Sequence, residues 1–580
     1  MDTTLPIYTE KNDCKDCYKC VRFCPVKAIK VEEDSASIID EQCIHCGICT
    51  LICPTHAKKV RNDLNKAQNL LLTNVNVIAS IAPSYISDFD GITPSQMITA
   101  LKTLGFNEVS ETALGAEIVS YNCRELLKKS SANFFISSAC PSVVELIEKY
   151  YPEYNSNITP LMSPMAAHGK LLKNLNSEQK IIFISPCVAK KVEVDREDST
   201  IDVAITFRDL KEWFAQAGID PYSYSIDESY KFYPENAASA AMYPMDGGMI
   251  NSIKSGVTFT NYAFMAFSGI DNIKKVLHRI DEFKSIKPVF LELLACEGGC
   301  INGPGTTCTH SLVQKRYALL KDSSDVSFKN AHCYPSDIVY AYNSNEIIAN
   351  NSYSENEIKE VLQSIGKLSD TDELNCGGCG YNSCRDFVIA CLDKKAEHNM
   401  CVSYMRQVAH NKAHVLLQKM PSGVVMVNED LIVIESNKNF AKALGSDMEM
   451  IYDVNSGLEG ADLRKIVPFY KLFKSVLSNG DAILEKDLRI EGRFIHLSIF
   501  TIQKNKVVCG LFRDMSTPEV RREEVVKRTQ KVIKENLSTV QQIAFLLGEN
   551  ASRTESMLNS IVDSFNLEYD TKIEQDKLGK

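Results

Sequence analysis

The sequence of 580 residues has little of what marks a membrane, secreted or nucleic-acid-binding protein. It contains no run of 18 apolar residues, so we expect no membrane span. Acidic residues outnumber basic ones by 74 to 64, and the formal charge of −10 argues against nucleic-acid binding. The N-terminus lacks a basic segment followed by an apolar one. We therefore expect no secretory signal and a cytoplasmic location.

Motifs for nucleotide binding and phosphotransfer are also missing. Neither GxGxxG nor GxxxxGK[ST] occurs, which argues against a nucleotide-binding site. No kinase, cyclase or phosphatase motif is visible either. A signal from this chain would therefore have to act on a separate partner.

Cysteine, by contrast, is abundant, with 21 residues. In a chain of cytosolic type, this many cysteines argue for metal ligation rather than disulfides. Sixteen of them sort into four sets, described below. We assign no role to the remaining five, which are Cys123, Cys308, Cys333, Cys391 and Cys509.

Residues 1–62 carry two copies of the pattern C-x2-C-x2-C-x3-C, each followed by proline. Thiolates at this spacing hold a [4Fe–4S] cube, and in two-cluster proteins the fourth cysteine of each run ligates the other cube. Four thiolates also suit zinc, but tandem runs of this kind have little other use. The segment resembles bacterial two-cluster ferredoxins, which are α+β domains. The expected ligands are Cys14, Cys17, Cys20 and Cys53 for one cluster, and Cys24, Cys43, Cys46 and Cys49 for the other.

Residues 63–365 have the pattern of an α/β domain. Apolar, β-rich runs at 133–140, 180–187 and 289–296 each end in a cysteine, and helical patterns at 94–106 and 141–151 lie between strands. Strands that alternate with helices predict a largely parallel sheet. In such folds ligands bind beyond the carboxyl ends of the strands. The three cysteines therefore fall where a ligand is expected.

Three segments of this domain, SSACPSVV, SPCVAKK and LLACEGGC, resemble the large domain of [FeFe]-hydrogenases and occur in the family's order. The resemblance covers residues 76–365, with a weaker echo in SPMAAHG at 163–169. It implies an H-cluster, in which a [4Fe–4S] cube joins a diiron unit that carries CO, cyanide and a dithiolate bridge. The implied ligands of the cube are Cys140, Cys187, Cys296 and Cys300, and Cys300 would bridge to the diiron unit.

The same resemblance implies roles for two residues of PCVAKKVE. Lys190 matches the family lysine that donates a hydrogen bond to a cyanide, and a fixed ammonium suits an anionic acceptor. A solvated surface lysine is the alternative. Glu193 matches the glutamate that follows in that motif, and we expect it to belong to the catalytic site as well.

Several positions depart from the family pattern around the diiron unit. Ala139 stands where the most active members have a cysteine that relays protons, and alanine cannot carry a proton. Ser185 and Leu294 replace two methionines that pack around the diiron unit, and Pro304 interrupts the glycine run after the fourth ligand. The ligands are thus kept while their surroundings are altered.

A missing proton relay predicts slow turnover. Loss of a general acid or base commonly costs about 10²–10⁴ in rate. We expect protons to take another route, and Glu292 and Glu297 are the candidates because they lie on or next to the strand that ends in Cys296. The alternative is that both are ordinary solvated or paired acids.

Residues 366–405 hold the fourth set of cysteines. A polar linker, GKLSDTDELN, precedes NCGGCGYNSC, and glycines in that stretch let backbone amides approach cluster sulfides. The segment resembles a small single-cluster [4Fe–4S] module of corrinoid proteins and sensory regulators, and structural zinc is the alternative. A helical stretch separates the last two ligands. The expected ligands are Cys376, Cys379, Cys384 and Cys401.

Residues 406–516 contain no metal motif. A connector helix at 406–419 precedes two strands around a tight turn, a helix that begins near Asn437, and three more strands at 482–490, 493–502 and 506–515. This order resembles a PAS sensor domain, which is α+β. A generic α+β domain is the alternative.

Residues 517–580 predict output or dimerisation helices and a frayed tail. Val526, Ile533, Val540 and Leu547 recur every seven residues, which gives an apolar seam for helix pairing. We expect a homodimer on this basis. A helix that packs back on its own sensor domain is the alternative.

Together these patterns predict a multidomain protein: a ferredoxin domain, an α/β hydrogenase large domain, a small iron–sulfur module, a PAS domain and C-terminal helices. The function that we expect is a sensory [FeFe]-hydrogenase with low activity towards H2 and protons, which carries an H-cluster and three further [4Fe–4S] clusters. It would exchange electrons with a ferredoxin-like partner and signal to a kinase or phosphatase. The alternatives are an ordinary ferredoxin-coupled hydrogenase and a hydrogenase-like assembly protein without a diiron unit.

Overall fold

The structure of the protein is a computed structural model. The described residues are 5–516, with gaps at 131, 228, 281, 283–286, 324–336, 343–346, 349–350, 456 and 481–482, and a few positions between 529 and 538. They form two compact units, Met1–Met405 and Arg406–Lys580. The predicted seam and tail of 517–580 otherwise lie outside the described residues. No described helix is long and apolar enough to cross a membrane.

The N-terminal part of the first unit repeats a strand-and-helix pattern around its cysteines. Strands β1 and β4 pair antiparallel, as do β2 and β3, and the two short helices contact each other. The cysteine runs occupy the loops and the short helices between these strands. The elements are β1 (Ile7–Thr9), α1 (Lys19–Phe23), β2 (Ile29–Glu32), β3 (Ser35–Ile38), α2 (Ile48–Ile52) and β4 (Lys58–Val60).

The large domain contains two parallel sheets in place of the single sheet that the sequence suggested. One has the order β6-β5-β8-β9 and the other the order β10-β11-β7. Strands β5, β8 and β11 are almost wholly apolar and buried, as expected of parallel strands covered on both faces. The strands are β5 (Val77–Ile81), β6 (Glu108–Glu111), β7 (Phe134–Ile136), β8 (Lys180–Ser185), β9 (Val203–Thr206), β10 (Ala263–Ser268) and β11 (Val289–Leu294).

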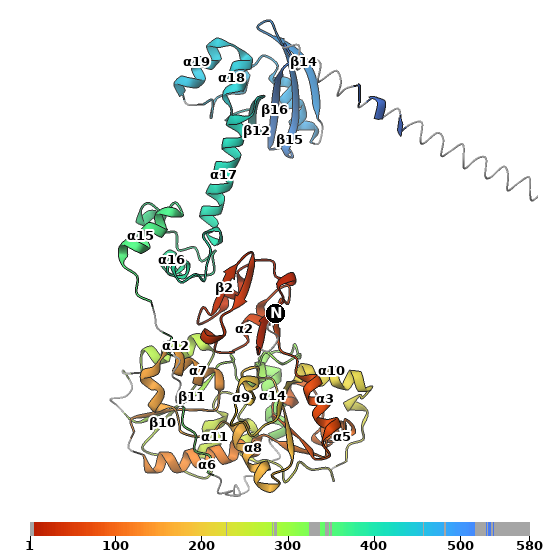
Figure 1. Cartoon of the computed structure of the whole chain (residues 1–580), viewed down its shortest axis with the longest axis vertical. Coiled ribbons are helices and arrows are strands. Elements are labelled where there is room, and N and C mark those ends of the chain that lie inside the picture. Colours follow the sequence, from red (N-terminus) through yellow and green to blue (C-terminus); the bar gives the residue numbers. More distant parts are fainter. Residues whose placement is uncertain are drawn as a thin grey trace, which may run out of the picture. The chain divides into compact units, whose positions relative to one another are not determined.

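Helices connect and cover these strands (Figure 1). Two of them begin at side-chain caps that the sequence makes plain: Thr93 and Gln96 form a capping box for α5, and Ser163 caps α8. The helices are α3 (Leu64–Thr73), α4 (Tyr85–Asp88), α5 (Pro94–Thr103), α6 (Ala113–Lys129), α7 (Pro141–Tyr150), α8 (Pro164–Leu175), α9 (Ala189–Val194), α10 (Phe207–Ala217), α11 (Gly248–Lys254), α12 (Ile270–His278) and α14 (Leu312–Ser323).

The small module that follows is larger than its cysteine pattern indicated. Helix α15 (Glu355–Ser364) packs through Ile358 and Leu362 into the same core as α16 (Cys384–Leu392). The domain boundary predicted at residue 365 would therefore divide α15 from the core into which it packs. The predicted linker is also folded, since Lys367 is buried and donates to the carbonyl of Asp372 at 2.7 Å. The helical stretch after Cys384 ends at Leu392, before Lys394 with its φ of +58°.

The second unit holds a five-stranded antiparallel sheet with the order β13-β12-β16-β15-β14. The predicted strands and the helix start at Asn437, which caps α18, are confirmed. Helix α18 lies beside β12, and α19 contacts α18 (Figure 1). Phe440, Phe473 and Phe512 lie in the core of this unit. The elements are α17 (Val402–Lys419), β12 (Gly423–Asn428), β13 (Val433–Ser436), α18 (Lys438–Leu444), α19 (Ser446–Asn455), α20 (Leu463–Ile466), α21 (Tyr470–Asn479), β14 (Leu484–Ile490), β15 (Arg493–Gln503) and β16 (Val507–Asp514).

Candidate metal centres

The ends of three strands bring one cysteine set together. Cys140 follows β7, Cys187 follows β8 and Cys296 follows β11, so the site lies where the carboxyl ends of the two sheets meet. A cavity of about 110 Å³ opens there. The residues that line it include Ala139, Cys140, Ser185, Cys187, Lys190, Tyr243, Leu294 and Cys300.

The thiols of this set are half-buried and lie close to one another. Burial and then the charge of Cys140 raise the pKa of Cys187 to about 11. The pKa of Cys296 is likewise raised by burial and then by the charges of Cys300, Cys187 and Cys140. Metal ligation needs thiolates, so binding of a cluster would release protons from these thiols. Soft thiolates gathered around one cavity fit an iron–sulfur centre.

A site for a single metal ion would need different geometry from a cluster site. Among the described residues, no three His, Cys, Asp or Glu side chains are close enough to hold one ion. The fit of a cluster therefore rests on the cavity and on the mutual proximity of the thiols.

Lys190 is a buried residue of the cavity wall and not a solvated surface lysine. Its Nζ donates to Oγ of Ser163 at 2.8 Å and to Oε2 of Glu193 at 2.6 Å, and the hydroxyl of Ser163 donates to the other oxygen of Glu193. An ammonium has three donors. After the hydrogen bonds to Ser163 and Glu193, one donor is left for a ligand in the cavity.

The departures from the family pattern gather on the wall of this cavity. Ala139, Ser185 and Leu294 all line it, and none of them offers a group that exchanges protons near neutral pH. Tyr243 lines it too and shares a 2.7 Å hydrogen bond with Ser120. Apart from its thiols, Lys190, Tyr243 and the hydroxyl residues Ser84, Thr112 and Ser185, the cavity wall is apolar.

Glu292 and Glu297 have different surroundings. Glu297 is exposed. Glu292 is buried on β11, and its carboxylate accepts hydrogen bonds from the backbone N–H groups of Ile250 at 3.0 Å and Met249 at 3.4 Å. Burial nevertheless raises the pKa of Glu292 to about 7. Its charge in turn raises the pKa of Cys300, after burial and the other thiols of the set, so Glu292 lies near the ligands although it does not line the cavity.

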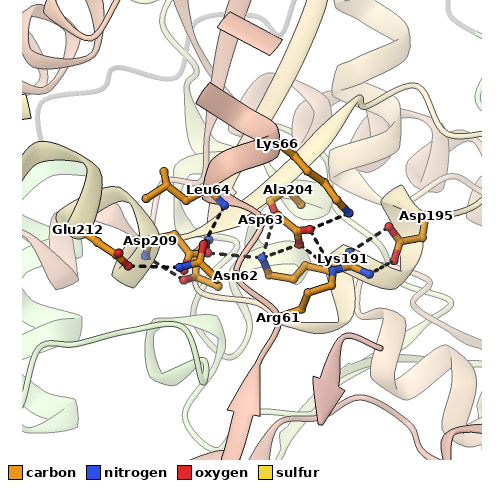
Figure 2. A network of polar contacts seen from close by, with 11 residues as sticks. Arg61, Asn62, Asp63, Leu64, Lys66, Lys191, Asp195, Ala204, Asp209 and Glu212 are labelled. Atoms are coloured by element: carbon orange, nitrogen blue, oxygen red, sulfur yellow. Dashed lines mark hydrogen bonds and ion pairs between the residues drawn. The ribbon is translucent and has the colours of Figure 1, made fainter. Parts of the chain in front are cut away.

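Helix α9 is fixed from its other side by Lys191 (Figure 2). The Nζ of Lys191 is buried and lies 3.0 Å from Asp63, 3.4 Å from Asp209 and 3.1 Å from the carbonyl of Ala204. Burial alone would raise the pKa of Asp63, but the charge of Lys191 and its other partners holds that pKa below its ordinary value. The two adjacent lysines therefore have different roles. Lys190 faces the cavity, and Lys191 holds its helix against the segment that follows the N-terminal domain.

The second N-terminal cysteine set lies next to the cavity set. Burial and then the charges of Cys24 and Cys140 raise the pKa of Cys46 to about 12. The thiols of Cys43, Cys46 and Cys24 all raise the pKa of Cys49, after burial. Cys24 therefore lies near the second run, and its ligation of the second cluster stays a prediction.

A buried imidazole joins the two domains at this point. His45 bonds through Nδ1 to Glu145 of α7 at 2.8 Å and through Nε2 to Asp40 at 3.0 Å. Burial alone would lower the pKa of His45, but the hydrogen bonds to Asp40 and Glu145 outweigh it and raise the pKa to about 9. Lys149 adds a 2.7 Å hydrogen bond to the carbonyl of Cys43, so α7 contacts both the second run and, at its start, Cys140.

The cysteines of the small module also share one environment. Cys379, Cys384 and Cys401 belong to or border the module core, whereas Cys376 is exposed. Burial raises the pKa of Cys379, and the charges of Cys401 and Cys376 raise it further. Residues from both ends of the module thus meet at one place.

Sequence patterns did not single out several polar residues near these sites. Ser163, Tyr243 and His45 show their importance only through contacts with distant segments. Of these three residues, only Ser163 could have been noticed in the sequence, because it begins the SPMAAHG segment that weakly resembles the hydrogenase family. Of the unassigned cysteines, Cys123 and Cys509 are buried, Cys308 and Cys391 are half-buried, and Cys333 lies outside the described residues.

Comparison with known families matches three segments of the chain. Residues 75–304 match the model "Iron only hydrogenase large subunit, C-terminal domain". Residues 6–61 match a "4Fe-4S dicluster domain", and residues 372–403 match a model named FeS for an iron–sulfur cluster segment. The chain therefore contains an iron-only hydrogenase-type domain and a ferredoxin-type domain.

Individual relatives are distant. The large subunit of the periplasmic [Fe] hydrogenase of Nitratidesulfovibrio vulgaris is 26% identical over 263 residues, which are 37% of this chain and 62% of that protein. The cytosolic Fe-S cluster assembly factor NAR1 of Kluyveromyces lactis is 24% identical over 277 residues, which are 36% of this chain and 59% of that protein. This chain thus spans less than two thirds of the length of these relatives.

Among solved structures, a variant of the [FeFe]-hydrogenase HydA1 of Chlamydomonas reinhardtii is 20% identical, with a TM-score of 0.38. The match covers 47% of this chain and 92% of that one. A likeness of this strength carries no argument about activity.

Proposed function

We propose that the chain is a sensory [FeFe]-hydrogenase that reacts slowly and reversibly with H2 at an H-cluster. The observation that carries the proposal is the cavity where Cys140, Cys187 and Cys300 meet Lys190, with Ala139 in its wall. The family match over residues 75–304 supports the same site. Thiol ligands are present, while a proton-carrying side chain at position 139 is not.

The residues around the cavity have distinct proposed roles. Cys140, Cys187, Cys296 and Cys300 hold the cube, and the diiron unit, when bound, supplies the metal chemistry of H2. Lys190, fixed by its hydrogen bonds to Ser163 and Glu193, donates to an anionic ligand of that unit. The carboxylate of Glu193 balances the charge of this ammonium in a buried place.

Glu292 is the proposed alternative proton carrier. A carboxyl group with a pKa of about 7 holds and releases a proton near neutral pH, as a general acid or base must. Glu297, which is exposed, would exchange protons with solvent. Replacing each by Gln should lower the rate of H2 oxidation, and an unchanged rate for both would exclude this route.

Electrons are proposed to reach the cavity from a ferredoxin-like partner through the clusters of residues 1–62. The proximity of Cys46 to Cys140 supports this path. The second unit, with its five-stranded antiparallel sheet, is proposed to act as a PAS sensor, and residues 517–580 as output helices of a homodimer that signals to a kinase or phosphatase in the cytoplasm.

Infrared spectroscopy tests the core of the proposal. Anaerobic protein with its cubes in place is loaded with a synthetic diiron cofactor and measured with and without H2. CO and cyanide bands that shift under H2 are the expected result. Their absence in protein with intact cubes would reject hydrogenase chemistry at this site and favour the assembly-protein alternative, which the similarity to NAR1 supports.

Turnover then separates a sensor from an electron-coupled catalyst. Fast H2 oxidation with reduced ferredoxin as the product, despite Ala139, would favour the ordinary hydrogenase. For the sensor, hydrogen exchange of residues 406–516 should change between H2-reduced and oxidised protein. No change there would remove the basis of the sensory role, because communication needs a segment whose state depends on the input.

A further inference from the structure

Lys27 joins the small iron–sulfur module to the N-terminal domain. Its Nζ donates to the carbonyls of Val21 at 3.0 Å and Arg22 at 2.9 Å, at the end of α1, and also to the carbonyl of Gly380 in the module at 2.9 Å. One ammonium thus uses all three of its donors. Of these three bonds, two hold the helix that carries Cys20, and the third holds the loop that carries Cys379.

The two segments also touch through their backbones. Gly380 has a φ of +93°, and a side chain there would lie only 3.1 Å from the backbone nitrogen of Arg22 and 3.2 Å from Cβ of Val21. Arg22 donates to the carbonyl of Gly378 at 3.2 Å, and the backbone N–H of Val31 donates to the carbonyl of Lys395 at 2.9 Å. Glycine is required at 380 because α1 approaches its backbone directly.

Cysteines of both segments share one apolar core. Cys20 and Val21 of α1 pack in the same cluster as Phe387, Cys384 and Cys401 of the module. Tyr381 belongs to this core, and the Nζ of Lys27 lies 5.7 Å from the centre of its ring. Cys20 and Cys24 from one side of the interface and Cys379 from the other pack in or against the same core.

We infer that the module and the two-cluster domain form one electron-transfer unit, in which Lys27 and Gly380 position the Cys376–Cys401 ligand set against α1. In the proposed step, one electron leaves a reduced cluster of residues 1–62 and reduces the module cluster. The charge of each cluster changes by one, and no bond or proton moves. The module is then part of the relay, and α17, which begins directly after Cys401, starts at a redox centre.

This inference rests on the proposed iron–sulfur clusters but not on hydrogen chemistry at the cavity. The test therefore uses the full chain with its cubes and without the diiron unit. Dithionite reduces the protein stepwise, and electron paramagnetic resonance records each paramagnetic cluster. In the wild-type protein we expect the signal of the reduced module to be broadened by a reduced neighbour, and the Cys379→Ser variant to identify that signal by its loss.

Gly380→Ala and Gly377→Ala form a matched pair. Both glycines lie in the same loop with positive φ, but a side chain at 377 would meet only the carbonyl of Tyr381, at 3.7 Å, whereas one at 380 meets α1. Gly380→Ala should narrow the module signal and slow its reduction, and Gly377→Ala should retain the broadening. Iron content and the visible spectrum check that each variant keeps its clusters.

If the Gly380→Ala variant loses the module cluster, the Lys27→Met variant is used in its place. It removes the bridging ammonium without adding bulk at the interface, and Lys30→Met, at an exposed lysine paired with Glu32, is its control. An isolated, unbroadened module signal in the wild-type protein would overturn the inference. So would a broadened signal that neither Gly380→Ala nor Lys27→Met changes.

Discussion

Replacing Glu292 by Gln tests whether a buried carboxyl group near the cavity carries protons. The wild-type carboxyl is buried on β11, and its pKa is raised from 4.5 to about 7. At 1.36 kcal/mol for each pH unit, this shift corresponds to about 3 kcal/mol of preference for the neutral form. The charge of Asp246 raises the pKa as well, whereas hydrogen bonds from the backbone N–H groups of Ile250, Met249 and Gly247 lower it.

The sign of the stability effect follows from linkage. Since the folded pKa lies above the unfolded one, the folded protein binds this proton more tightly. The stabilisation is complete below the unfolded pKa and is lost as the pH rises through about 7. Between about pH 6 and pH 8, the wild-type protein should lose roughly 1 kcal/mol that the Glu292→Gln variant does not lose.

Infrared difference spectroscopy between wild type and variant measures the titration of this one carboxyl group. Hydrogen–deuterium exchange between H2 and heavy water measures proton transfer at the site. We expect a titration near pH 7 and an exchange rate about 10²–10⁴ lower in the variant, with unchanged CO and cyanide bands. A carboxyl group that is ionised at about pH 5 would refute the burial argument. An unchanged exchange rate would refute the relay while leaving the burial argument intact.

Three further predictions concern the cavity and the helix beside it. Lys190→Met removes the ammonium 2.6 Å from Glu193, which keeps the Ser163 hydroxyl as a donor, so it should lower stability by about 1–3 kcal/mol in thermal unfolding, and adding Glu193→Gln should recover part of the loss. Asp63→Asn should cost about 1–3 kcal/mol, because the buried Lys191 loses one charged partner and keeps Asp209 and the carbonyl of Ala204, whereas Lys66→Met, at an exposed partner of Asp63, should cost less than about 1 kcal/mol. Ala139→Cys should raise H2 oxidation in a viologen dye assay if the missing relay limits turnover, by up to about 10². An unchanged rate would show that another step is limiting.

Local chemistry is what the sequence could predict well. The spacing of the cysteine runs is set by how four thiolates reach one cluster, so it is visible within about 60 residues, and the family models match the same segments. The strands that end in Cys140, Cys187 and Cys296 were also predictable, because buried parallel strands are short continuous apolar runs. The sensor domain, its output helices and the proton route remain predictions.

Pairing and burial were decided by the tertiary structure. The family motif indicated a role for Lys190, but nothing in the sequence showed that Lys191 pairs with Asp63, 128 residues earlier. Both Glu292 and Glu297 were candidates from the sequence, but Glu292 is buried and Glu297 is exposed.

The same holds for Lys27, whose partner Gly380 is 353 residues away. The sequence by itself determined which residues are able to bind clusters, because ligand spacing is a local property of the chain. Only the folded chain decided which charges are buried, which are paired and which cysteine sets lie together, because those properties depend on segments that meet from distant positions.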